Sequence, residues 1–162
     1  MCALPSRLAA FFLFLFVSAF LAPPAHSAQG AALPVISARG LQKMLEESRG
    51  IPLVIEYWAS WCGPCRRFRQ KLERVRALYP ESELRILAIS LDENPEQAAA
   101  YAAKAPFPYP VVQADEAMRK SREGTSIPRT EFFGRDGNMV RETTGDIQEK
   151  RLNYYVRQLM EK

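Results

Sequence analysis

The two cysteines in the run WCGPC, at residues 61–65, are the side chains of this sequence best suited to redox chemistry. An apolar run at 52–58 precedes them and a basic helical run follows, which places both thiols at a strand-to-helix turn. Cys62 would then lie at the helix N-terminus, where unpaired N–H groups and the helix dipole favour negative charge. The pKa of its thiol should therefore fall from roughly 8.5 into the range of about 3.5–7.5.

Cys65 follows Cys62 by one helical turn, with Gly63 and Pro64 between them. It should point the same way from a more buried position, so that the two thiols can close a small disulfide. We therefore assign Cys62 as the exposed attacking thiolate and Cys65 as the resolving thiol. The full run at 61–65 is far more specific for such a pair than a bare C-x-x-C spacing.

The rest of the composition excludes several other kinds of site. The only histidine, His26, and the third cysteine, Cys2, lie in the first 27 residues. Beyond that segment a histidine base and a His-containing metal site are excluded, and a single cysteine pair indicates redox chemistry rather than a disulfide scaffold. The same two thiolates could instead bind copper or zinc, but no further His, Met or Cys is placed to complete a site. The formal net charge of +4 gives no case for nucleic-acid binding.

Residues 1–27 have the form of a secretory signal peptide. Arg7 supplies the positive start, and the run 8–22 is uncharged but shorter than the ~20 residues that a membrane-spanning helix needs. We expect cleavage near Ala28 and export to the periplasm, with a retained N-terminal anchor as the alternative. A single domain then follows at residues 33–162.

Hydrophobic periodicity and turn residues predict an alternation of strands and helices in that domain. The expected strands are 33–36, 52–58, 84–91, 109–113, 129–133 and 139–143. The expected helices are 37–49, 63–79, 94–104, 115–124 and 146–160. Ser37, Asn94 and Asp115 are the expected N-caps of the first, third and fourth of these helices. The last two strands form a hairpin about the turn at 135–138. This order indicates an α/β domain with a mixed sheet.

The helix at 63–79 carries six basic side chains on the faces that its apolar residues leave free. We expect these cations to form a solvated surface, with the nearest helping to keep a thiolate charged. They are Arg66, Arg67, Arg69, Lys71, Arg74 and Arg76.

These motifs resemble the thioredoxin superfamily, and within it the exported TlpA/ResA-like thiol-disulfide oxidoreductases. The resemblance runs from about residue 33 to residue 160 and is based on EYWASWCGPC, Ile127-Pro128, the Asp136-Gly137 turn and the final helix. It implies a thioredoxin fold, in which a central mixed sheet is flanked by helices. The helix and strand at about 95–113 match the insertion of the TlpA-like branch.

The resemblance also implies roles for residues around the cysteines. Pro128 matches a cis-proline that lies against the pair and exposes the backbone of Ile127 for strand-like pairing with a client peptide. Trp58 and Trp61 match aromatic residues that shape the surface around Cys62.

Glu56 lies in the apolar strand 52–58, where a carboxyl group is costly to bury unless it is paired. It falls where thioredoxin has a buried acid beneath the dithiol, and Ala88 falls where thioredoxin has a lysine beside that acid. Burial should raise the pKa of Glu56, which would suit it to take and return the proton of Cys65. A pairing of Glu56 with a lysine or arginine is the alternative.

Two residues depart from the pattern of the family after the proline. Arg129 replaces the usual threonine, so we expect a more positive client groove. Glu131 occupies a strand position that is normally apolar, and we expect a nearby arginine to pair with it.

The resemblance implies reduction of disulfides in client proteins through Cys62 and Cys65. The Gly-Pro dipeptide between the cysteines is typical of reducing members, whose potentials lie near ~ −270 mV rather than ~ −120 mV. The implied electron donor is an integral-membrane thiol reductase, and cytochrome c biogenesis is one implied process. We expect a monomer without a cofactor. A copper or zinc carrier is the alternative from the binding class, and a peroxidase on the same fold is disfavoured because it needs a different cysteine motif.

Overall fold

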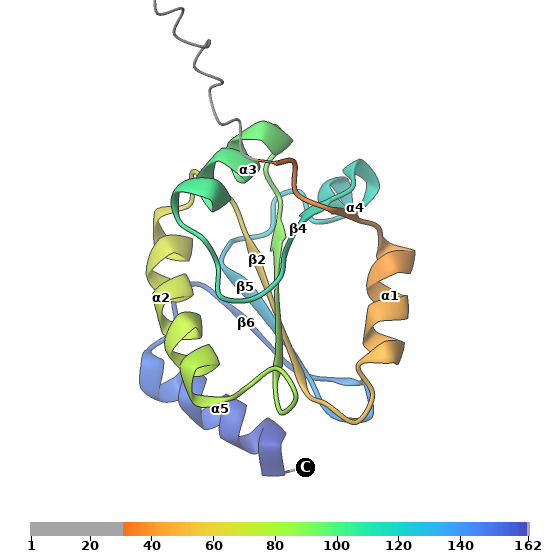
Figure 1. Ribbon diagram of the computed structural model, residues 1–162, viewed down its shortest axis with the longest axis vertical. Coiled ribbons are helices and arrows are strands. Elements are labelled where there is room, and N and C mark those ends of the chain that lie inside the picture. The colour runs from red at the N-terminus through yellow and green to blue at the C-terminus, as the bar shows by residue number, and fades with distance from the viewer. Residues whose placement is uncertain (1–30, 162) are drawn as a thin grey trace, which may run out of the picture.

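A mixed sheet of six strands forms the centre of the computed structural model, which describes residues 31–161 (Figure 1). The strands lie in the order β1-β4-β3-β2-β5-β6. The first four in that order are parallel, whereas β5 is antiparallel to both β2 and β6. Their bounds are β1 Val35–Ile36, β2 Leu53–Trp58, β3 Arg85–Ser90, β4 Val111–Ala114, β5 Arg129–Phe133 and β6 Met139–Thr144. The signal-peptide prediction for residues 1–27 lies outside the described residues.

Five helices cover the two faces of this sheet (Figure 1). Helices α2, α3 and α5 pack on one face, and α1 and α4 pack on the other. Three of them begin at the side chains that sequence patterns indicated, because Ser37, Asn94 and Asp115 each accept an N-terminal backbone N–H. Their bounds are α1 Ala38–Glu47, α2 Gly63–Leu78, α3 Pro95–Lys104, α4 Glu116–Ser121 and α5 Glu149–Glu161.

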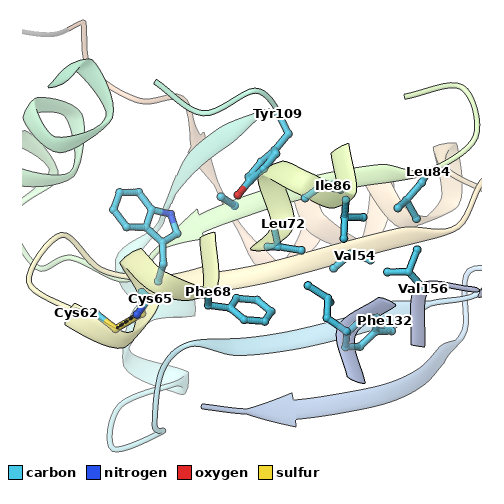
Figure 2. Close-up of a cluster of buried hydrophobic side chains, with 14 of the residues drawn as sticks. Val54, Cys62, Cys65, Phe68, Leu72, Leu84, Ile86, Tyr109, Phe132 and Val156 are labelled. Carbon is cyan, nitrogen blue, oxygen red and sulfur yellow. Dashed lines mark hydrogen bonds between the residues drawn. A yellow bond between two sulfur atoms is a disulfide. The ribbon is translucent and has the colours of Figure 1, made fainter. Parts of the chain in front are cut away.

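The redox pair lies at one end of the larger apolar core, between the sheet and helices α2, α3 and α5 (Figure 2). All six residues of β2 are buried, as expected for a strand covered on both faces. Phe68 and Leu72 of α2 pack onto it and have no exposed surface. The end of β2 and the start of α2, which hold the two cysteines between them, are therefore fixed by the core.

The insertion at 95–113 adds a strand inside the sheet rather than at its edge. Strand β4 pairs on one side with β3 and on the other with β1, both in parallel. Its pairing with β3 begins at the carbonyl of Pro110, which accepts the N–H of Ala88, whereas the proline nitrogen has no hydrogen to donate. This explains why β4 begins at Val111, two residues later than predicted.

The final helix also begins later than predicted, at Glu149 instead of residue 146. Asp146 does not enter the helix, because its carboxylate binds Lys71 at 2.6 Å and Arg67 at 3.0 Å on α2. Gly145 precedes it with a φ of 83°, which turns the chain from β6 toward α2.

Strand β6 forms one outer edge of the sheet and is largely exposed. Its register against β5 shifts between Phe132 and Phe133, so that Phe133 faces Met139 and Phe132 faces Arg141. Among the helices within residues 31–161, none is long and apolar enough to span a membrane.

Candidate active site

Cys62 and Cys65 are joined by a disulfide at the N-terminus of α2, with an S–S distance of 2.04 Å and Cα atoms 5.3 Å apart. Cys62 is the N-cap residue, and its Sγ accepts the N–H of Cys65 at 3.1 Å. Gly63 and Pro64 form the first turn of the helix. The Sγ of Cys62 therefore occupies the position where the helix terminus stabilises negative charge.

The two cysteines differ little in burial, contrary to the expectation of an exposed Cys62. Cys62 is 4% exposed and Cys65 is 2% exposed. Trp61, at 68% exposure, provides the exposed aromatic surface next to the pair. Trp58 does not contribute to that surface: it is 2% exposed and packs at a tilt against Tyr101 and Phe107, whose ring centroids lie 5.2 and 5.0 Å from its own.

The Ile127-Pro128 bond is cis, as the resemblance implied, and it lies beside the disulfide. The Sγ of Cys62 is 3.8 Å from the carbonyl oxygen of Ile127. The structure therefore brings together residues that are 65 positions apart in the sequence. Pairing of Ile127 with a client peptide stays a prediction.

Glu56 is fully buried in β2, and neither of its carboxylate oxygens has a hydrogen-bond partner within residues 31–161. Burial raises its pKa from 4.5 to about 8; the charge of Arg69 opposes this rise and that of Glu73 adds to it. Ala88 lies opposite Glu56 on β3, and Thr130 lies opposite on β5. No ion pair with a lysine or arginine forms among the described residues, so the pairing alternative is wrong.

Glu56 and Cys65 both line a narrow void that is too small to hold a water molecule. Trp58, Arg69 and Phe107 are among its other walls. The indole Nε1 of Trp58 is also buried, without a hydrogen-bond partner in the described part of the chain. Glu56 and Cys65 thus share a void of low polarity, which favours the neutral form of the acid.

The basic face of α2 is solvated only in part: Arg66, Arg67 and Arg74 are exposed as predicted, and the other three basic residues are more buried. Arg69 is only 8% exposed, and the side chain of Lys71 is 17% exposed. Arg74, whose side chain is 53% exposed, binds Glu149 of α5. The charges of this face are therefore largely paired within the fold rather than free in solvent.

Asp92 is a site residue that the sequence reasoning missed. It is 1% exposed, and its carboxylate accepts the N–H of Ser60 at 2.9 Å and the hydroxyl of Ser60 at 2.6 Å. The hydroxyl of Ser90 donates to it as well, at 2.8 Å. Asp92 therefore holds the segment before Cys62 against the end of β3. Its position just after β3 was the available signal, because neighbouring parallel strands end at the same edge of a sheet.

A second buried network supports the segment that leads to Pro128. Arg122 pairs with Glu131 at 3.0 Å and donates to the hydroxyl of Tyr57 at 2.7 Å, while that hydroxyl donates to Glu131 at 3.1 Å. The predicted arginine partner of Glu131 is thus confirmed. Arg129 pairs with Glu142 and lies 3.7 Å from Glu131, so its charge is balanced and the expectation of a more positive groove is wrong.

An open groove of about 490 Å³ lies next to the redox pair. Trp61 and Ile127 form its side toward the cysteines. The start of α3 and the end of α4 form its other walls. Among residues 31–161, no group of three or more His, Cys, Asp or Glu side chains is placed to hold a metal ion.

Comparison with known proteins identifies the family. The thioredoxin family model matches residues 35–126. Thioredoxin 1 of Synechococcus elongatus is 34% identical over 70 residues, which are 43% of this chain and 63% of that protein. Thioredoxin 1 of a Nostoc species is 31% identical over 71 residues, which are 44% of this chain and 64% of that one. The chain thus spans less than two thirds of the length of these relatives.

Solved structures share the fold at low sequence identity. A candidate thiol:disulfide interchange protein DsbE from Chlorobium tepidum superposes with a TM-score of 0.66 at 21% identity, over 80% of this chain and 92% of that one. A thiol-disulfide isomerase from Corynebacterium glutamicum gives a TM-score of 0.62 at 17% identity, over 72% and 85% of the two chains. The family match, the fold and the Cys62–Cys65 pair agree, and the chain belongs to the thioredoxin family.

Proposed function

We propose that this chain is an exported thiol-disulfide oxidoreductase that reduces disulfides in client proteins through Cys62 and Cys65. The observation that carries the proposal is the disulfide at the N-terminus of α2, placed beside the Ile127 carbonyl and above the buried acid Glu56. A disulfide at a helix start with a neighbouring acid has the parts that thiol–disulfide exchange needs: a stabilised thiolate and a proton carrier.

The reaction starts from the reduced pair. The Cys62 thiolate attacks one sulfur of the client disulfide, which forms a mixed disulfide and releases the other client sulfur as a thiolate. Cys65, deprotonated, then attacks the Sγ of Cys62 and releases the second client thiolate. Two electrons pass to the client, whose two thiolates take up protons from the solvent, and the chain is left with the Cys62–Cys65 disulfide.

Glu56 takes the proton from Cys65 before that second attack. Its pKa of about 8 is close to the ordinary pKa of a thiol, roughly 8.5, so a proton can pass between the two groups without a large energetic cost. When a donor later reduces the disulfide, the neutral carboxyl of Glu56 returns the proton to the leaving Cys65 thiolate.

The groove beside Trp61 and Ile127 is the place where the client polypeptide would lie. Its walls come from the start of α3 and the end of α4, and Leu91 also lines it. The exposed Trp61 gives a client an apolar contact next to Cys62. A short extended segment around the client cysteine would fit this groove and reach the Ile127 backbone.

The cellular setting follows from residues 1–27 and from the Gly-Pro dipeptide. An exported reductant in an oxidising periplasm must receive electrons across the membrane, so the donor is an integral-membrane thiol reductase. Apocytochrome c cysteines, copper-site assembly proteins and misoxidised proteins are the client classes we propose. N-terminal sequencing of the protein from a periplasmic extract tests the export: a start near Ala28 supports it, and a start at Met1 in the membrane fraction supports the anchored alternative.

The decisive test of the reaction compares Cys65→Ser with Cys62→Ser in an exporting cell. Cys65→Ser should accumulate covalent client adducts, because the first attack proceeds and the release does not. Cys62→Ser should trap few clients and reduce no disulfides. The readout is non-reducing electrophoresis followed by mass spectrometry of the trapped partners.

Equal trapping by both variants, or none by either, would contradict this division of roles. The soft-metal alternative is separated from the oxidoreductase by equilibrium dialysis with copper(I) alongside a dithiol titration. Tight binding of copper by the reduced chain, without disulfide reductase activity, would replace the proposed function.

A further inference from the structure

Arg69 is a buried cation that the proposed reaction does not use. It lies one helical turn after Cys65 on α2, and only 8% of its surface is exposed. Burying a guanidinium costs free energy unless partners replace its water. The other five basic residues of α2 donate their hydrogen bonds to different acceptors.

The partners of Arg69 come from its own helix and from the insertion at 95–113. Its Nε donates to Glu73 at 2.8 Å, and its Nη2 donates to the carbonyl of Pro106 at 2.8 Å. Its guanidinium carbon lies 3.9 Å from the ring centroid of Phe107 and 5.7 Å from that of Tyr101. Three of these four partners belong to the insertion, so the insertion fixes where this charge sits.

Arg69 lines the same void as Glu56 and Cys65. The charged or titratable groups that face Glu56 are Arg66, Arg69 and Glu73 from α2 and Tyr109 from the segment before β4. On the strands, Ala88 and Thr130 face it and bring no charge. Arg66 is exposed and its guanidinium lies 3.5 Å from the Ser60 carbonyl. Arg69 is therefore the buried cation that this carboxyl experiences.

We propose that Arg69 is a positioning residue of the redox site, a cation that the insertion holds at the wall of the void so that it faces Glu56 as the carboxyl exchanges its proton with Cys65. This inference rests on the proposed function for the role of that proton, but not for the interaction itself. It also gives the insertion a part in the chemistry, because the Pro106 carbonyl and the Phe107 ring hold the guanidinium in place.

Arg69 and Glu73, which are bound to each other, have opposite effects on the pKa of Glu56. The positive charge of Arg69 favours ionised Glu56 and lowers its pKa, whereas the negative charge of Glu73 raises it. Removing Arg69 should therefore raise the pKa of Glu56 further, and removing the charge of Glu73 should lower it. A residue that served only packing would not produce this pair of opposite shifts.

The test is a titration of the Glu56 carboxyl by ¹³C NMR in the full oxidised chain, with Glu56→Gln used to assign the signal. Arg69→Met should shift the midpoint upward by about one pH unit, the low end of what a nearby charge produces. Glu73→Gln should shift it downward, and Arg69→Lys should stay closer to the parent chain. Arg74→Met removes one paired arginine from the same helix, away from the void, and should leave the midpoint unchanged.

The titration needs no client, so it separates this inference from the proposed function. A shift in Arg69→Met no larger than that in Arg74→Met would overturn the inference, as would a shift of the same sign in Arg69→Met and Glu73→Gln. If Arg69→Met does not fold, Arg69→Gln takes its place: an upward shift of the midpoint supports the inference, and an unchanged or lowered midpoint refutes it.

Discussion

Glu56 shows at the scale of one residue how this fold keeps a reactive group. Its two carboxylate oxygens are buried and have no hydrogen-bond partner among the described residues. Such a group destabilises a native state, and perturbed acids of this kind concentrate at functional sites. The void shared with Cys65 supports the proposed role of this carboxyl as a proton carrier.

Glu56→Gln should therefore keep the fold and slow the release of clients from the Cys62 mixed disulfide. The glutamine has nearly the same shape but cannot take a proton from Cys65. Loss of general acid–base catalysis typically costs about 10²–10⁴-fold, so we expect a slowing of at least about tenfold near neutral pH. Stopped-flow measurement of mixed-disulfide resolution across pH gives the comparison. An unchanged pH–rate profile in Glu56→Gln would exclude the proton-transfer role.

Sequence patterns predicted the central residues of the site but not their supports. The WCGPC run identified Cys62 and Cys65, and the charge inside an apolar strand identified Glu56. Arg69 escaped because a basic residue on a helix is normally solvated, and its burial depends on an insertion that is distant in the sequence. Exposure of Cys62 was also mispredicted, since the burial of a helix terminus depends on which loops cover it.

At the scale of elements, a strap of ion pairs joins α2 to α5 and to the turn before it. Its pairs are Arg67–Asp146, Lys71–Asp146 and Arg74–Glu149. Lys71 binds the carboxylate of Asp146 at 2.6 Å and the Ile147 carbonyl at 2.7 Å. Burial alone would raise the pKa of Asp146, but hydrogen bonds from Lys71 and Arg67 outweigh it and lower the pKa. The strap thus holds the helix that bears the cysteines against the C-terminal helix.

Asp146→Ala should destabilise the fold by about 1–3 kcal/mol, because it leaves a half-buried lysine without its charged acceptor. Urea unfolding monitored by circular dichroism measures the change. Glu47→Ala serves as the control, because it breaks an exposed ion pair in which the side chain of Lys43 is 75% exposed and that of Glu47 is 63% exposed. It should lower the unfolding free energy by no more than about 0.5 kcal/mol. Equal effects of the two substitutions would show that the strap adds nothing beyond a surface pair.

The elements themselves were largely predictable because most of their signals are local. Ser37, Asn94 and Asp115 are caps that a short window of sequence reveals, and the structure uses all three. The start of α5 was missed because Asp146 is recruited by side chains 75 and 79 residues away. The place of β4 inside the sheet follows from pairing with β1 and β3, which no local pattern records.

At the scale of the whole molecule, Glu56 links stability to pH. Its pKa is 4.5 as an ordinary side chain and about 8 in the folded chain. Between these two values the folded state binds more protons than the unfolded state, so the contribution of Glu56 to stability falls as the pH rises. Below about pH 4.5 both states hold the proton and the effect vanishes.

We therefore expect Glu56→Gln to gain stability over the parent chain as the pH increases. The difference in unfolding free energy between the two should grow by about 3 kcal/mol from pH 5 to pH 8, since each pKa unit corresponds to about 1.4 kcal/mol. Urea unfolding at pH 5, 6, 7 and 8 provides the comparison in the oxidised state. Parallel stability curves for the two chains would mean that Glu56 is not protonated in the fold.

Strand β6 is an open edge of the sheet, to which a strand of a neighbouring chain could add. Its outer backbone groups face away from β5, and Met139 and Val140 are about half exposed, which together form a template for strand addition and aggregation. Two charged residues interrupt that template: Arg141 lies over the ring of Tyr155, and Glu142 is bound to Arg129. The register shift opposite them bends the edge as well. The sheet can thus end at β6 without recruiting a strand from a neighbouring chain.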